Sequence, residues 1–302
     1  MSDKKKVVFI LGPTGVGKTS FSVKIAKEFN AEIISADSVQ IYKGFDVGSA
    51  KVTEEEMSGV THYGIDIVSP EKEFSVFDFV EYTKNKIEEI SAKGKLPIIV
   101  GGTGLYVKAL LENYNFGGAA KHIEFRQNLE KEIEEFGLEF VYQKLLKLNK
   151  DLAEKIDSKN KVRVIRAFEI ATFGENQTKQ ESEYDFKVFA LNMDRTILYE
   201  RINLRVDLML KDGLLKEVKN LYDTYKLCQP MRAIGYKEVV EFLENRCSKE
   251  EMIEKIKQHS RNYAKRQITF LKGMPYVNFV NVENKEEAYK EMKKEIEKWL
   301  AK

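Results

Sequence analysis

The chain has 302 residues, of which 43% are hydrophobic and 32% charged, with a formal net charge of +2, a balance that allows a buried core and excludes an intrinsically disordered protein. It has no apolar run of the roughly 18 residues that a transmembrane helix needs, and its polar, basic start argues against a signal peptide. Only Cys228 and Cys247 occur, far apart and without nearby histidines, which argues against disulfides or a zinc site and favours a cytoplasmic protein.

Apolar runs alternate with helical patterns over the first part of the chain. Residues 7–11 form an apolar run that ends in glycine, and residues 31–35 and 96–100 form two more. Apolar residues at helical spacing follow at 18–29, and a capping box beginning at Ser75 starts another helix. Strands and helices that alternate at these lengths predict an α/β fold with a parallel sheet flanked by helices.

A charged segment without strand signals interrupts this alternation. Residues 117–183 contain 12 Lys or Arg against 13 Asp or Glu and have helical patterns only. We interpret this segment as an all-helical insertion, after which residues 186–191 add a strand to the first sheet. The predicted organisation is therefore a core of residues 1–116 and 184–302 around the insertion. The last part is helical, with a second capping box beginning at Ser248, apart from a candidate short strand at 276–282.

A phosphate-binding loop lies between the first strand and the first helix. The P-loop pattern is matched by Gly12, Pro13, Thr14, Gly15, Val16, Gly17, Lys18 and Thr19. In this pattern the main-chain N–H groups converge on phosphate oxygens, the lysine adds positive charge, and the hydroxyl of Thr19 is a candidate ligand for Mg²⁺. The strand at 96–100 ends in glycines rather than an acid, which argues against nucleotide hydrolysis.

A carboxylate follows the second predicted strand. Asp37 lies at the carboxyl edge of the sheet, where ligands bind in open α/β folds. We interpret it as a general base or as a ligand of Mg²⁺ through water, and the alternative is that it only caps the following turn. Ser38 and Gln40 are candidates for hydrogen bonds to the edge of a base.

Positive charge is concentrated in one predicted helix near the end of the chain. Residues 255–272 contain six Lys or Arg and no Asp or Glu. Lys257, Arg261 and Lys265 are spaced four apart, which predicts a basic stripe that can follow a phosphate backbone. Phe270 in the same segment is predicted to be a core residue.

Eight short motifs are spread in order over nearly the whole chain. They occupy residues 12–19, 35–38, 47–51, 62–66, 101–106, 163–167, 233–237 and 261–267. Each motif is weak by itself, but the ordered set resembles the tRNA dimethylallyltransferase family in its bacterial form. The resemblance implies a P-loop NTPase-like fold. It also implies transfer of the dimethylallyl group from dimethylallyl diphosphate to N6 of the adenosine beside the anticodon of tRNA, with Mg²⁺ and release of pyrophosphate.

The resemblance also implies roles for individual residues. Asp37 matches the catalytic base, and Thr19 and Arg205 match groups that steady the leaving pyrophosphate. The implied tRNA contacts are Asp37, Ser38, Val39, Gln40, Thr103, Arg126, Lys161, Arg163, Arg166, Arg232, Gly235, Tyr236, Lys237, Arg261, Lys265 and Arg266. We expect the anticodon stem-loop as the part of tRNA that is bound, and a monomeric enzyme.

Three rival functions remain open at this point. An adenylate isopentenyltransferase would use the same loop and base on free AMP, and a nucleotide kinase would hold its metal with Asp194. A non-catalytic RNA-binding protein would keep only a vestigial P-loop. The basic helix and the insertion favour tRNA over AMP, because a small nucleotide needs neither. The presence of Lys18, Thr19 and Asp37 argues against a vestigial loop.

Overall fold

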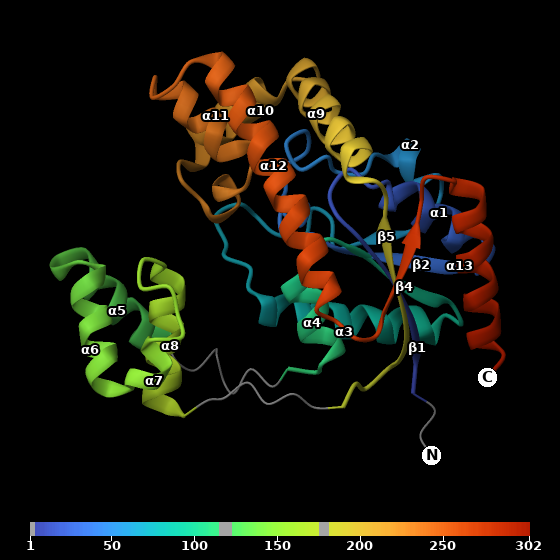
Figure 1. Ribbon diagram of the computed structural model, residues 1–302, viewed down its shortest axis with the longest axis horizontal. Coiled ribbons are helices and arrows are strands. Elements are labelled where there is room, and N and C mark those ends of the chain that lie inside the picture. Colours follow the sequence, from blue (N-terminus) through green and yellow to red (C-terminus); the bar gives the residue numbers. More distant parts are fainter. Residues whose placement is uncertain (1–3, 115–122, 175–180) are drawn as a thin grey trace. The chain divides into compact units, whose positions relative to one another are not determined.

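The computed structural model describes residues 4–114, 123–174 and 181–302 (Figure 1). The contacts divide the chain into two compact units. The first unit is Met1–Leu111 together with Ser182–Lys302, and the second is Glu112–Glu181.

A six-stranded sheet organises the first unit, and every strand pairing in it is parallel. The strands are β1 (Lys6–Leu11), β2 (Ala31–Ala36), β3 (His62–Tyr63), β4 (Leu96–Gly101), β5 (Asp185–Asn192) and β6 (Val277–Asn281). Their spatial order is β3-β2-β4-β1-β5-β6. The predicted parallel α/β fold is confirmed, and the segment that follows the second unit does return to the sheet, as β5 beside β1.

Helices connect and flank these strands. They are α1 (Lys18–Glu28), α2 (Glu54–Met57), α3 (Val76–Ala92), α4 (Gly104–Leu111), α9 (Arg195–Lys211), α10 (Leu214–Tyr225), α11 (Tyr236–Leu243), α12 (Lys249–Lys272) and α13 (Lys285–Leu300). Both predicted capping boxes are present, at Ser75 before α3 and at Ser248 before α12, where each side chain satisfies an N–H group of the first turn. No described helix is long and apolar enough to span a membrane.

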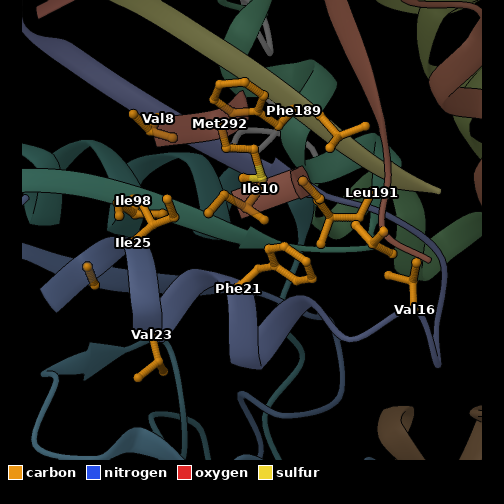
Figure 2. Close-up of a cluster of buried hydrophobic side chains, with 14 of the residues drawn as sticks. Val8, Ile10, Val16, Phe21, Val23, Ile25, Ile98, Phe189, Leu191 and Met292 are labelled. Carbon is orange, nitrogen blue, oxygen red and sulfur yellow. The ribbon is translucent and has the colours of Figure 1, made fainter. Parts of the chain in front are cut away.

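One core cluster lies where α1 and α13 pack on the sheet (Figure 2). Val8 and Ile10 of β1 meet Phe21 and Ile25 of α1, and Met292 of α13 closes the cluster. Residues 7–11 of β1 are all buried, which is why this strand reads as a continuous apolar run rather than an alternating one. Packing in this cluster therefore holds α1 against the sheet.

The strand register brings three loops together at one edge of the sheet. Gly101 of β4 pairs with Leu11 of β1 on one side and with Ala36 of β2 on the other. The chain leaves all three strands at this edge, because the strands are parallel. The loops that begin at residues 12, 37 and 102 therefore start side by side.

The second unit is helical throughout its described residues. It contains α5 (Ile123–Phe136), α6 (Leu138–Leu148), α7 (Lys150–Ala153) and α8 (Lys161–Phe173). These helices enclose a small core of their own, which includes Val141 and Leu145 of α6 and Val164 and Phe168 of α8. A separate core is what allows such a segment to be inserted into the chain without interrupting the sheet.

Candidate active site

Residues 12–19 join β1 to α1 in the conformation that a phosphate loop requires. Gly15 and Gly17 have φ angles of 82° and 100°, in the left-handed region that favours glycine. Gly17 is the N-cap of α1 and offers no side chain to the first N–H groups of the helix. The loop and these N–H groups line a cavity, so the positive end of the helix is available to an anion.

Two cations and one carboxylate meet over this loop. Lys18 Nζ donates to the main-chain oxygens of Gly12 and Pro13 at 3.0 and 2.9 Å. Desolvation, together with the nearby Arg205, lowers the pKa of Lys18 to about 8, although Asp37 acts in the opposite direction. Desolvation also lowers the pKa of Arg205, against the effect of Asp37. Because positive charge exceeds negative charge here, the site favours a bound anion.

Two cavities meet at this edge of the sheet. The first, of about 630 Å³, is lined by the phosphate loop and by residues of α9 and α12. The second, of about 370 Å³, is lined by Arg232 and Lys237 together with apolar residues of α9. Asp37, Arg205 and Tyr263 line both cavities. A group bound to the phosphate loop and a second group in the neighbouring cavity would therefore meet at Asp37.

The carboxylate of Asp37 is oriented by the turn that follows β2. Its Oδ1 accepts hydrogen bonds from the N–H groups of Val39 and Gln40, at 2.9 and 3.3 Å. The turn-capping role that the sequence left open is therefore present, but it occupies one oxygen only. The other oxygen, Oδ2, forms no hydrogen bond to any residue in the described part of the chain. The carboxylate is thus held in place while one oxygen remains available to accept a proton.

Ser38 and Gln40 lie beside Asp37, but their polar groups are used differently. Gln40 Nε2 donates to the main-chain oxygens of Ser49 and Ala50, at 3.3 and 3.1 Å. The amide of Gln40 is therefore engaged by this loop, so its predicted role in reading a base edge does not fit this conformation. The N–H of Ser38 donates to Thr103 Oγ1 at 3.3 Å, which ties the loops after β2 and β4 together.

Several of the predicted tRNA contacts border the second cavity. They are Ser38, Val39, Arg232, Gly235, Lys237 and Arg266. Tyr236 is different, because its side chain is fully buried and its hydroxyl donates to Glu217 at 2.8 Å. Its ring packs so closely that a Cβ at Gly48 would lie 2.6 Å from it. The side chain of Tyr236 is therefore a core group in this structure, so the predicted contact with tRNA stays a prediction for its main chain alone.

The predicted basic stripe along α12 is only partly exposed. Lys257 pairs with Asp207 at 2.7 Å, and Arg261 Nη1 donates to Asn203 at 2.6 Å, so α9 engages both residues. Lys265, one turn further, is exposed. The prediction of one continuous stripe is therefore wrong, because helical spacing does not show which residues face a neighbouring helix.

Two further residues of α12, Phe270 and His259, have surroundings that the sequence did not predict. The side chain of Phe270 is 36% exposed rather than buried in a core. Lys108 Nζ lies 5.8 Å from the centre of its ring. His259 Nδ1 lies 2.6 Å from Oε1 of the buried Glu238, so it is a partner of a structural carboxylate.

In the second unit, two of the predicted tRNA contacts share one buried partner. Arg126 and Arg166 both bind the carboxylate of Glu169, which is 1% exposed, and the Arg166 contact measures 3.1 Å. Lys161 lies 3.6 Å from Glu130. Arg163 is exposed at the start of α8. The ion pairs orient Arg126 and Arg166 but also use part of their hydrogen-bonding capacity.

Three residues near the site were not among the predicted site residues. Arg201 Nε donates to the main-chain oxygen of Gly15 at 2.9 Å. Its place one helical turn before Arg205 is a signal that could have revealed it. Gln267 bonds to the phosphate loop, and Glu217 bonds to residues 46–48. Neither shows a sequence signal beyond its motif or helix, because each partner is distant in the chain.

Comparison with known proteins decides the family. The family model described as IPP transferase matches residues 40–274. The chain belongs to the IPP transferase family. Two relatives of this IPP transferase are the tRNA dimethylallyltransferases of Bacillus cereus (strain ATCC 10987 / NRS 248) and Bacillus anthracis. Each is 48% identical to it over 92% of the chain, with 90% and 91% of the relatives covered.

Solved structures agree with this assignment. A tRNA isopentenylpyrophosphate transferase from Bacillus halodurans has a TM-score of 0.75 at 40% identity, with 99% of both chains covered. A eukaryotic dimethylallyltransferase acting on tRNA has a TM-score of 0.77 at 30% identity, covering 93% of this chain and 75% of the other. The predicted resemblance and the predicted fold class are confirmed, and this member of the IPP transferase family is an enzyme of the transferase class.

Proposed function

We propose that this IPP transferase moves the dimethylallyl group of dimethylallyl diphosphate onto N6 of the adenosine beside the anticodon of tRNA. The observation that carries the proposal is the place of Asp37, which lines both the cavity over the phosphate loop and the neighbouring cavity. The names of the relatives, which are tRNA dimethylallyltransferases, support the choice of substrates. In this proposal the enzyme acts on tRNA in the cytoplasm. It acts as a monomer.

In the proposed reaction the diphosphate lies over residues 12–19. The bond between the allylic carbon and its oxygen breaks, and the electron pair leaves with pyrophosphate. Main-chain N–H groups, Lys18 and Arg205 stabilise the negative charge that grows on the leaving group. These groups are held in place by the fold before the reaction begins, so little reorganisation is required.

Mg²⁺ fits this site as a partner of the diphosphate. Protein-bound Mg²⁺ commonly uses one or two side chains and takes its other ligands from phosphates and water. Thr19 supplies a hydroxyl on the cavity over the phosphate loop, and the diphosphate and water would supply the remaining ligands. When bound, the metal would neutralise charge on the departing pyrophosphate.

The amine of adenine approaches from the second cavity in this proposal. Ile202, Val206 and Met209 give that cavity an apolar wall, and Arg232 and Lys237 add positive charge at its border. The N6 lone pair forms the new bond to carbon, and Asp37 accepts the proton that N6 loses. A base must leave its stack to reach the cavity, which costs a few kcal/mol that contacts to phosphates offset.

The structure gives the kinase alternative no support at Asp194. This residue caps α9, where its Oδ1 accepts from the N–H of Thr196 at 2.7 Å and of Ile197 at 3.3 Å. It lines neither of the two cavities that meet at Asp37. Transfer to free AMP uses the same groups as transfer to tRNA, and the experiment below separates the two.

The test is incubation with dimethylallyl diphosphate labelled in its carbon chain, Mg²⁺, and either tRNA or AMP. We expect label on tRNA, release of one pyrophosphate per transfer, and loss of labelling when the adenosine beside the anticodon is replaced by guanosine. Label on AMP alone would identify the rival isopentenyltransferase. Phosphoryl transfer from ATP to either acceptor would overturn the proposal.

A further inference from the structure

One face of α12 rests on the loop that follows β4. Tyr263, Gln267 and Phe270 are spaced at i, i+4 and i+7, so they project from the same side of the helix. A Cβ on Gly104 would lie 2.3 Å from the ring of Phe270, and one on Gly102 would lie 2.1 Å from Nε2 of Gln267. A side chain at either glycine would therefore displace the amide of Gln267 or the ring of Phe270.

Gln267 contributes an amide to this face, and the residue is only 7% exposed. Its Oε1 accepts a hydrogen bond from the N–H of Thr14 at 2.9 Å, in the phosphate loop. Its Nε2 donates to the main-chain oxygen of Gly102, also at 2.9 Å. Only this orientation of the amide satisfies both main-chain groups, because one is a donor and the other an acceptor.

These two bonds join parts of the site that are far apart in sequence. Thr14 belongs to the loop that binds the donor, and Gly102 precedes Thr103, which bonds to the N–H of Ser38 beside Asp37. The same helix carries the exposed Lys265 and Arg266. A single amide therefore connects the donor loop, the loop beside the base and the helix with two of the predicted tRNA contacts.

We propose that Gln267 is a positioning residue for the transfer reaction. It holds the start of the phosphate loop at a fixed distance from the loop beside Asp37, and so aligns the allylic carbon with the attacking amine. Its own amide is committed to Thr14 and Gly102, so it acts through them. The inference rests on the proposed function, because the alignment matters only if two substrates meet at this edge.

Loss of the Gln267 amide would affect both the alignment of the two loops and the main-chain groups that it binds. Without the amide, the N–H of Thr14 and the oxygen of Gly102 lose their partner, and such buried groups are costly to leave unpaired. The loops then relax toward water or toward each other. A displacement of about 1 Å between reacting groups is enough to reduce a rate by roughly a hundredfold.

The test compares Gln267→Met, which keeps the length of the side chain and removes both hydrogen bonds, with Gln258→Met. Gln258 lies nine residues earlier on the same helix and is exposed, so the control makes the same chemical change on the opposite face. Single-turnover transfer is measured at saturating tRNA and donor. Affinities for tRNA and for inorganic pyrophosphate, and the melting temperature, are measured separately.

We expect Gln267→Met to lower the single-turnover rate by about 10- to 100-fold, to weaken pyrophosphate binding several-fold, and to leave tRNA affinity within about twofold. Gln258→Met should match the wild type throughout. Gly102→Ala should be as damaging as Gln267→Met. It should cost little more when it is added to Gln267→Ala, because the clash and the hydrogen bond involve the same pair.

Wild-type turnover in Gln267→Met, or a loss confined to tRNA affinity, would overturn the inference while the proposed function stands. If the wild type transfers no dimethylallyl group, the proposed function fails, and the pyrophosphate titration still decides the role of Gln267. Equal pyrophosphate affinity in the wild type and Gln267→Met then contradicts it. Weaker pyrophosphate binding in Gln267→Met but not in Gln258→Met supports the role of Gln267 in holding the phosphate loop.

Discussion

At Asp37 the backbone has already used one carboxylate oxygen. Oδ1 accepts two N–H groups, from Val39 and Gln40, and this arrangement fixes the plane of the carboxylate beside Lys18 and Arg205. In the proposed reaction, the hydrogen bonds that make Asp37 a turn cap would also limit rotation of the base. Removing the carboxylate should therefore affect the reaction more than the binding of either substrate.

We predict that Asp37→Ala loses at least about 100-fold in turnover, the scale of a positioned general base, while tRNA affinity stays near that of the wild type. Asp37→Asn keeps the cap and cannot accept the proton, so it should lose nearly as much. Transfer rates and filter binding of tRNA measure the two effects. Near-normal turnover in Asp37→Asn would remove Asp37 from the role of base.

The buried positive charge of Lys18 reduces the stability of the ligand-free protein in our interpretation. Its ammonium is desolvated and lies near Arg205, which together depress its pKa to about 8. Such a charge is better stabilised once a diphosphate is present. The ligand-free protein therefore carries an electrostatic cost that the bound anion removes.

We predict that pyrophosphate at 100 times its dissociation constant stabilises the protein by about 2.7 kcal/mol and raises its melting temperature by roughly 4 °C. Lys18→Met should abolish most of this shift, because the bound anion loses a positive partner. The ligand-free variant should melt no lower than the wild type. Calorimetric melts with and without pyrophosphate measure both. A lower melting temperature in the ligand-free variant would contradict the electrostatic cost assigned to Lys18.

At the scale of elements, α10 is connected to the site by one carboxylate. Glu217 accepts hydrogen bonds from the N–H groups of Asp46, Val47 and Gly48, at 3.1, 2.6 and 3.0 Å, and from the hydroxyl of Tyr236. These residues lead directly into the two whose main-chain oxygens hold the amide of Gln40. The loop beside Asp37 therefore depends on a helix that lies about 170 residues later in the chain.

We predict that Glu217→Gln lowers the free energy of unfolding by about 1–3 kcal/mol, because an amide NH₂ would face N–H donors and leave them unpaired. Turnover should fall as well, since the loop that holds Gln40 is released. Tyr236→Phe removes one of the four donors and should cost less than Glu217→Gln. Denaturant unfolding and transfer rates measure the comparison. The reverse order of costs would show that the loop does not depend on the carboxylate.

At the scale of the whole molecule, the location of positive charge matters more for phosphate binding than the net charge does. The net charge is only +2, and the helix with six positive residues pairs some of them internally, as Lys257 does with Asp207. Among the described residues, no ion pair engages Lys265, and Arg266 lies over the ring of Tyr263. The exposed end of α12 is therefore the part of this helix that can neutralise phosphates.

We predict that Lys265→Ala and Arg266→Ala each weaken tRNA binding and reduce the slope of log affinity against log salt by about 0.7–0.9, the value for one phosphate contact. Lys257→Ala, which removes an internally paired lysine from the same helix, should leave the slope unchanged. Binding titrations over a range of salt concentrations measure all three. An unchanged slope in Lys265→Ala would take that residue out of the tRNA contact surface.

Local patterns predicted much of this molecule. The apolar runs found β1, β2, β4 and β5, and the capping boxes at Ser75 and Ser248 marked the starts of α3 and α12. The phosphate loop was evident because its function depends on consecutive residues, from Gly12 to Thr19. Such features need only neighbouring residues, and their backbone conformations follow from residue type.

The sequence by itself thus determined β1, β2, β4, β5 and β6 in their chain order, the phosphate-loop pattern and the family, because each depends on residues that are close in the chain or on an ordered set of motifs. Only the tertiary structure decided which side chains are free to act. Lys257 was predicted from its spacing to be available, Gln40 from its place beside Asp37, and Tyr236 from the family resemblance. Each is engaged by another group of the fold. Gln267 and Glu217 act through main-chain partners, and main-chain groups are identical in every residue, so no pattern of side chains could reveal those bonds.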